Sequence, residues 1–111
     1  MGITKSEIFT VHQNQLAQFA KAFSHPARVA ILQYLFKTKS CVCGSLVDEI
    51  GLAQATISQH LKELKNLGLI QGTVEGTSVC YCINAEVWEE MKGVMTSFLN
   101  QDVTAIDDTC C

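Results

Sequence analysis

Two apolar-patterned segments on either side of Gly51 constrain the fold of this chain most strongly. In both, apolar residues recur every three or four positions, which is typical of a helix with one buried face. They are Leu46, Val47 and Ile50 before the glycine, and Ile57, Leu61, Leu64 and Leu67 after it. Gly51 supplies the backbone freedom that a tight turn between two helices needs. The pattern predicts helices over about 43–50 and 54–67, joined as a helix-turn-helix.

The N-terminal third of the chain predicts two further helices. Apolar residues recur at helical spacing from residue 6 to residue 23, and Ser6 is placed as the N-cap. Pro26 is placed as the first residue of a helix that runs to about Lys37, because proline is favoured in the first helical turn.

The C-terminal half predicts a β-hairpin and a last helix. Two short strands within residues 69–83 flank the turn Glu75-Gly76-Thr77, and Asn84 is placed to cap a helix from 85 to about 100. The predicted order is α-α-α-turn-α-β-β-α, a mainly α winged helix-turn-helix with a small β-hairpin. We expect residues 1–100 to form this one domain and residues 101–111 to form a flexible, cysteine-containing tail.

The composition indicates a dimer and limits the kind of nucleic-acid binding. Hydrophobic residues make up 48% of the 111 residues and charged residues only 17%, so a monomer is expected to expose a large apolar patch. The first and last helices carry many large apolar side chains, and we expect them to form the seam of a homodimer. The formal net charge of −3 argues against indiscriminate nucleic-acid binding but leaves room for a local basic face.

The chain has no sequence signal for a membrane or for export. No apolar stretch approaches the roughly 18 residues of a membrane span, and the N-terminus lacks the apolar core of a signal peptide. We therefore expect a cytoplasmic protein without a membrane partner, in which cysteines are available as thiols.

The polar face of the helix from Gln54 has the composition of a DNA-reading surface. Glutamine can bond an adenine edge in two places, serine and threonine can bond bases or phosphates, and lysine suits phosphates. Between Gln54 and Gly72 the only acid is Glu63, fewer than a generic solvated helix carries. The candidate DNA contacts are Gln54, Thr56, Ser58, Gln59, His60, Lys62 and Lys65. For His60 the alternative is a ring packed against the turn.

Three stretches of the chain resemble the ArsR/SmtB family of winged-helix metalloregulators. They are Ala53–Ile70, the run Ser24-His25-Pro26-Ala27-Arg28-Val29-Ala30-Ile31-Leu32, and the wing from Gly72 to Ile83. The resemblance spans about residues 15–100. It implies a homodimeric repressor, not an enzyme, that binds an inverted-repeat DNA operator and releases it on binding an effector. The family usually has Asp-Pro where this chain has His25-Pro26, a departure that removes the usual acidic cap.

The segment Cys41-Val42-Cys43 resembles the Cys-Val-Cys of the arsenite- and antimonite-responsive branch of that family. The branch usually continues with Asp and Leu, where this chain has Gly44-Ser45. Side chains two residues apart on a regular helix diverge by about 200°, so both thiols can bind one ion only at a starting or distorted helix. Unpaired N–H groups at a helix start would favour thiolates. The expected effector is As(III) or Sb(III); Cu(I), Cd(II) and Zn(II) also accept sulfur ligands.

The remaining cysteines supply candidates for a third ligand. Cys110 and Cys111 are the chosen ones, because the last ten residues span up to about 33 Å when extended and can reach their own site or the partner's. Cys80 and Cys82 lie on one face of the second predicted wing strand. We expect them to pack against neighbouring helices; a second soft-metal site and a redox pair are the alternatives.

Three other functions remain open at this stage. The same repressor could respond to thiol oxidation instead of a metalloid, or it could be a constitutive member with a vestigial thiol site. A thiol metalloid carrier or oxidoreductase that does not act on DNA belongs to a different class. The chain has no Cys-x-x-Cys redox motif or catalytic Cys/His arrangement to support that class.

Overall fold

The computed structural model describes residues 5–38, 41–43, 46–76 and 78–105. Its elements are α1 (Lys5–Ile8), α2 (Val11–Ala20), the 3-10 helix η1 (Lys21–Phe23), α3 (Pro26–Thr38), β1 (Val42–Cys43), α4 (Leu46–Ile50), α5 (Gln54–Asn66), β2 (Ile70–Glu75), β3 (Ser78–Ile83), α6 (Ala85–Leu99) and the 3-10 helix η2 (Val103–Ala105). The predicted winged helix-turn-helix is confirmed: α4 and α5 are the two helices of the motif, and β2 and β3 are the wing.

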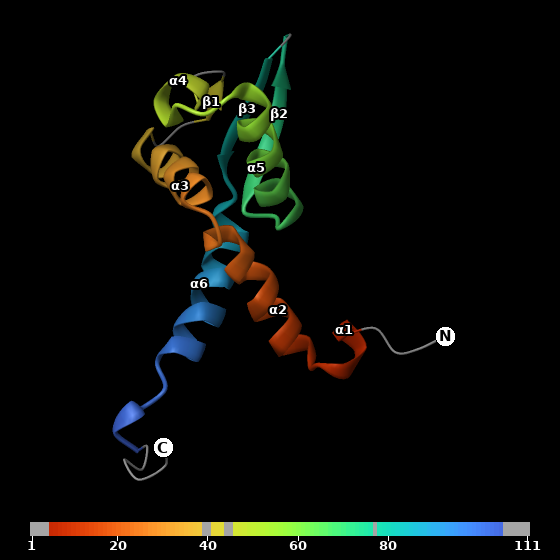
Figure 1. Ribbon diagram of the computed structural model, residues 1–111, viewed down its shortest axis with the longest axis vertical. Helices are drawn as coiled ribbons and strands as arrows, with labels where there is room; N and C mark the ends of the chain where they lie inside the picture. Colours follow the sequence, from red (N-terminus) through yellow and green to blue (C-terminus); the bar gives the residue numbers. More distant parts are fainter. Residues whose placement is uncertain (1–4, 39–40, 44–45, 77, 106–111) are drawn as a thin grey trace.

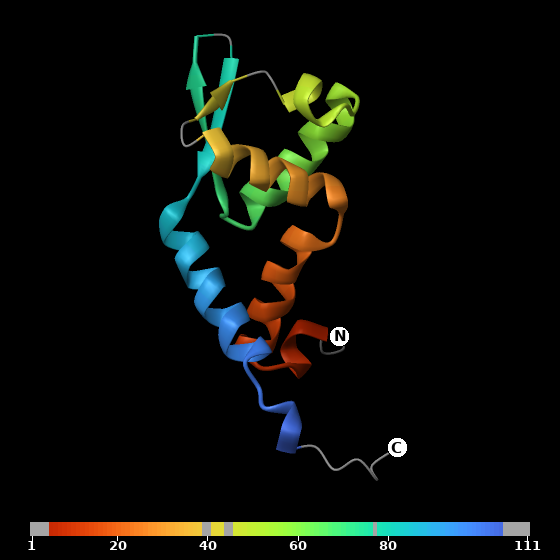
Figure 2. The same cartoon turned by 90° about the vertical axis from the view of Figure 1, so that its left-hand side faces the viewer.

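The molecule is elongated, with extents of 58 × 41 × 26 Å. Figures 1 and 2 show α3, α4, α5 and the sheet packed together at one end, while α2 and α6 extend away from them. These two helices are linked by a hydrogen bond from Gln15 Nε2 to Glu90 Oε1 (2.8 Å). No helix in the described ranges is long and apolar enough to span a membrane.

The centre of the core lies between α3 and α5. The buried apolar side chains are Ala27, Ile31, Leu32 and Leu35 of α3, and Ile57, Leu61 and Leu64 of α5. Burying such a side chain stabilises the fold by about 1.5–3 kcal/mol. The face of α5 that points away from this core is thereby fixed, and it is the polar face.

Two glycines with positive φ set the ends of the recognition helix. Gly51 has φ +82° in the turn that precedes α5, as the sequence predicts. Gly68, also at φ +82°, follows α5. Its N–H donates to Lys65 O (2.9 Å), and the Leu69 N–H donates to Leu64 O (3.2 Å). This pair of bonds is the Schellman motif, which satisfies the last carbonyls of the helix and turns the chain into β2.

The N-terminal helix differs from the predicted one. The continuous helix expected from Ser6 to Phe23 is divided into α1, α2 and η1, and Thr10 is the N-cap of α2. The Gln13 N–H donates to Thr10 Oγ1, and the Thr10 N–H donates to Gln13 Oε1, each at 3.0 Å. This capping box accepts Gln as well as Glu at its third position, so the prediction of Ser6 as the N-cap was wrong.

The helix predicted over 43–50 is also shorter than expected. Only Leu46–Ile50 form α4, and Val42–Cys43 form the strand β1. The strand pairs antiparallel with β3, which gives the sheet order β1-β3-β2, with Val42 opposite Tyr81 and Cys43 opposite Cys80. The buried, β-branched Val42 suits a strand, and β1 covers an edge of β3 that would otherwise be unpaired.

A polar cluster, in which His60 is buried and His25 is exposed, joins the start of α3 to α5. The Ala27 N–H donates to His25 Nδ1 (3.0 Å). His25 thus accepts a bond at the start of α3, where the family usually has an aspartate. Arg28 Nε donates to His60 Nδ1 (3.2 Å) and Arg28 Nη1 to Lys21 O (2.8 Å). The His25 and His60 ring centroids are 4.5 Å apart. The His60 ring therefore takes the packed position, one of the two alternatives that the sequence left open.

The pKa of His60 is lowered from its ordinary value of 6.5, first by burial and then by the neighbouring His25 and Arg28. The unfolded chain therefore binds a proton on acidification before the folded chain does. The contribution of His60 to the free energy of unfolding is therefore complete above about pH 6.5, and it is lost as the pH falls below that value.

We expect His60→Gln to lose less stability than the wild type between pH 7.5 and 5.5, because it removes the group that is protonated preferentially on unfolding. Urea denaturation at a series of pH values measures this. His12→Gln, at an exposed histidine, is the matched control and should follow the wild type. The same pH dependence in His60→Gln and wild type would contradict the assignment.

Candidate DNA interface and thiol cluster

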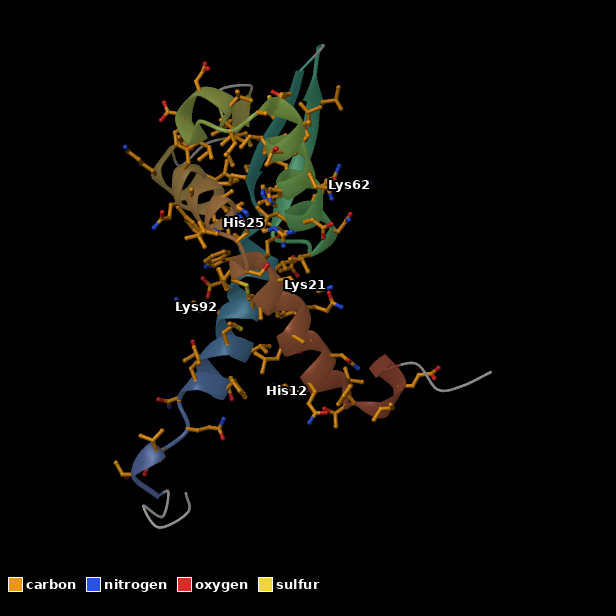
Figure 3. The ribbon with its side chains drawn as sticks, in the orientation of Figure 1. His12, Lys21, His25, Lys62 and Lys92 are labelled. Atoms are coloured by element: carbon orange, nitrogen blue, oxygen red, sulfur yellow. The ribbon has the colours of Figure 1, made fainter. Side chains whose placement is uncertain are left out.

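The recognition helix α5 presents a continuous polar face to solvent. Six of the seven predicted DNA contacts are exposed: Gln54, Thr56, Ser58, Gln59, Lys62 and Lys65. Figure 3 shows Lys62 projecting from α5 on the side away from α3. The seventh, His60, is only 9% exposed and faces inward. Its position three residues after Ile57 and four before Leu64 puts it on the apolar stripe, a signal that the sequence contained.

Two pairs of side chains along this face bond each other. Gln54 Nε2 donates to Ser58 Oγ (3.1 Å), and Gln59 Nε2 donates to Glu63 Oε1 (3.3 Å). Both pairs are solvent-exposed and one helical turn apart, a geometry that contributes only about 0.2–0.5 kcal/mol to helix stability. These amides can therefore exchange their partners for base edges at small cost.

The wing lies close to the basic end of α5. A Cβ built at Gly72 of β2 would lie 3.5 Å from Lys65 Nζ and 3.3 Å from the Tyr81 ring. The end of the Lys65 side chain thus lies beside β2 at Gly72. The recognition helix and the wing consequently form one surface rather than two separate ones. Sequence reasoning did not identify Gly72 or Arg28 as supports of this surface.

Cys41, which directly precedes β1, lies beside Cys82 of β3. A hydrogen bond with the Cys41 thiol, followed by burial, raises the pKa of the Cys82 thiol. Neither Cys41 nor Cys82 is in a disulfide, and Cys41 is exposed. Cys80 is 1% exposed and disulfide-bonded. The side chain of Cys43 lies outside the described part of the structure, as do all atoms of Cys110 and Cys111.

This arrangement corrects one expectation about the thiols and adds a contact to another. Cys41 and Cys43 do not lie at a helix start, because β1 ends before α4 begins, so the helix dipole is not what activates them. Cys82 also lies beside Cys41, the residue that directly precedes β1, a neighbour that the expected packing against helices did not include. Pairing between strands that are forty residues apart left no periodic signal in the sequence.

The donor set of this cluster suits a thiophilic ion when the thiols are reduced. Thiol sulfur is the preferred ligand of As(III), Cu(I) and other soft centres, and Cys41 and Cys82 already place two thiols in contact. Among the side chains that the structure describes, no three His, Cys, Asp or Glu groups are arranged to hold a metal ion. The Cys80 sulfur is oxidised, and a disulfide sulfur is not available as a thiolate ligand.

Known proteins share this fold and this sequence pattern. Residues 25–71 match the family described as bacterial regulatory protein, arsR family. An uncharacterized HTH-type transcriptional regulator of Methanocaldococcus jannaschii is 40% identical over 78 residues, which cover 68% of this chain and 86% of that protein. The HTH-type transcriptional repressor SmtB of Mycobacterium tuberculosis is 38% identical over 64 residues, which cover 58% of this chain and 47% of that protein.

Solved structures give the same result for the fold. The winged helix-turn-helix DNA-binding domain Mb0332 of Mycobacterium bovis, described as homodimeric, superposes with a TM-score of 0.63 at 24% identity. The superposition covers 87% of this chain and 88% of that one. Together with the exposed polar face of α5 and the adjoining wing, these matches show that the chain belongs to the arsR family of bacterial regulatory proteins and is a DNA-binding transcriptional regulator, not an enzyme.

Proposed function

We propose that this protein is a homodimeric repressor that binds an inverted-repeat operator and releases it when As(III) or Sb(III) binds at a thiol site containing Cys41 and Cys43. The observation that carries the proposal is the pairing of β1 with the wing strand β3. Because of this pairing, the strand β1, which contains Cys43 and directly follows Cys41, is part of the same sheet as the DNA-binding wing.

The DNA contacts in this proposal come from the exposed face of α5. Gln54 and Gln59 read base edges in the major groove, Thr56 and Ser58 bond bases or phosphates, and Lys62 and Lys65 bind phosphates. His60 is assigned no DNA contact. On the inner side of α5, its Nδ1 accepts a hydrogen bond from Arg28 of α3.

The dimer in this proposal is formed by α2 and α6. Several large apolar side chains on these helices and their flanks are exposed: Ile8 (65%), Phe9 (51%), Val11 (86%), Phe98 (47%) and Leu99 (71%). A groove of about 480 Å³ beside them is lined by residues that include Phe23, Trp88, Met95 and Leu99. A second copy of the chain would cover both, with two recognition helices positioned for two half-sites of the operator.

In this proposal, β1 couples ion binding to DNA binding, because it connects to the helix-turn-helix formed by α4 and α5. Residues 44 and 45 alone separate β1 from α4, and α4 packs on α5. An ion that draws β1 and its neighbours together changes the position of α4 and of the wing at the same time. A coupling free energy of about 1–3 kcal/mol is usual for such a linkage.

The Cys80 disulfide favours a second candidate trigger, which is thiol oxidation. In that case peroxide alone would release the operator, and a reductant would restore binding. The two triggers are separable because arsenite acts on reduced thiols and does not need an oxidant.

For the DNA surface, we expect Gln54→Ala and Gln59→Ala each to weaken operator binding by about 5- to 150-fold, the loss of one specific side-chain contact to a base. Fluorescence anisotropy with DNA from the protein's own promoter measures this. Gln33→Ala, at an exposed glutamine on α3, is the matched control and should bind as the wild type does. Unchanged binding in both test variants would exclude α5 as the reading helix.

For the dimer, we expect Leu99→Glu to shift the protein from dimer to monomer in sedimentation velocity, because a carboxylate would be buried at the seam. Val74→Glu, at a wing residue of similar exposure (74% against 71%), should remain dimeric. Dimers of equal stability in both variants would place the interface elsewhere.

For the effector, we expect arsenite to release the operator from the reduced wild type but not from Cys41→Ser or Cys43→Ser. Both variants must first bind the operator normally without arsenite, which controls for folding. Full arsenite response in both would refute the sensor assignment, and release by peroxide alone would favour the oxidation trigger.

A further inference from the structure

The register of β1 and β3 brings the backbone positions of four of the six cysteines next to one another. The register pairs Cys43 with Cys80 directly. Because the strands are antiparallel, moving two residues back from Cys43 and two residues forward from Cys80 places Cys41 opposite Cys82. Side chains at alternate positions of a strand share a face, and so do directly opposed residues on neighbouring strands. The backbone therefore puts Cys41, Cys43, Cys80 and Cys82 on one face of the sheet, opposite the face of Val42 and Tyr81.

Two observations describe the sulfur atoms of this face. The Cys82 and Cys41 thiols are hydrogen-bonded to each other. The Cys80 sulfur is bonded to another sulfur, although it is almost fully buried. On β3, the thiol that bonds Cys41 and an oxidised cysteine are therefore only two residues apart.

We propose that the thiophilic ion takes its remaining ligands from the wing strand, Cys82 first and Cys80 second, and not from the C-terminal tail. This inference rests on the proposed function, since it assigns ligands to that same site. An ion bound by β1 and β3 together would join the strand that leads into α4 to the strand that forms the wing. The ligands themselves would then carry the signal to the DNA surface.

The chemistry of arsenite binding balances without an outside reagent. Three thiols condense with As(OH)₃ to give As(SR)₃ and three waters, with no change in the oxidation state of arsenic or sulfur. The protonated Cys82 thiol is a competent partner for this condensation, because each S–H proton leaves with a hydroxide of arsenite as water.

Oxidation of the same face competes with ion binding. Two thiols and one hydrogen peroxide give one disulfide and two waters, and the two sulfurs are then lost as ligands. A phosphine reductant and one water return two thiols and a phosphine oxide. The reduced cluster is therefore the ion-binding form, and a disulfide at Cys80 leaves fewer donors for arsenite.

The test uses the full chain, reduced with a phosphine that is removed before arsenite is added. Arsenite is titrated while As–S absorbance is followed in the ultraviolet, and the protein is then alkylated and analysed by mass spectrometry. We expect Cys41, Cys43 and Cys82 to be protected from alkylation and Cys110 and Cys111 to be modified. Protection of a tail cysteine in place of Cys82 and Cys80 would overturn the inference, and this readout needs no variant.

Matched variants separate this inference from the proposed function. Cys82→Ser should lose most of the As–S absorbance at one equivalent of arsenite, while the double variant Cys110→Ser/Cys111→Ser should keep it. The opposite pattern would overturn the ligand assignment and leave the arsenite-responsive repressor intact. If wild type binds arsenite through Cys82 yet keeps its operator, the ligand assignment stands and the proposed function fails. Peroxide-treated protein should bind less arsenite; equal binding would refute the competition.

Discussion

The antiparallel pairing of β1 with β3 is the interaction on which the functional organisation of this protein depends. Without it, Cys41 and Cys43 would lie in a connection between two helices, remote from the wing. With it, Val42 is buried opposite Tyr81, and Cys43 is paired with Cys80 of β3. Two backbone-paired residues thereby join the thiol cluster, the wing and the start of α4 into one unit.

The recognition helix is held from behind by both apolar and polar contacts. Ile57, Leu61 and Leu64 pack on α3, and His60 accepts a hydrogen bond from Arg28 within the same interface. A buried polar group of this kind is costly unless it is bonded, so the Arg28–His60 contact also fixes how α5 sits on α3. The orientation of the DNA-reading side chains follows from this inner face.

The elements with a strong sequence period were the predictable ones. The apolar spacing of α3, α5 and α6, the glycine turn at Gly51 and the hairpin around Gly76 all appear in the structure near their predicted bounds. The strand β1 was not predictable, because two residues have no period and their stability comes from β3, almost forty positions later. The same long-range pairing hid the contact between Cys41 and Cys82.

Two local differences were readable from the sequence. The Thr10–Gln13 capping box has a sequence signature, because such a box takes Gln as well as Glu three residues after the N-cap. The spacing of His60 within the apolar stripe of α5 marked it as an inner residue. The roles of the six exposed α5 side chains and of Cys110 and Cys111 remain predictions, since they depend on DNA and on a bound ion.

The central claim is that the thiol cluster and the DNA surface are thermodynamically linked. Linkage is reciprocal, so an ion that weakens DNA binding must itself bind more weakly to the DNA complex by the same factor. The most direct measurement is the arsenite affinity of the reduced protein with and without saturating operator. We predict an affinity about 5- to 150-fold lower in the presence of DNA. Equal affinity in both states would contradict the account, because the cluster would then have no influence on DNA binding.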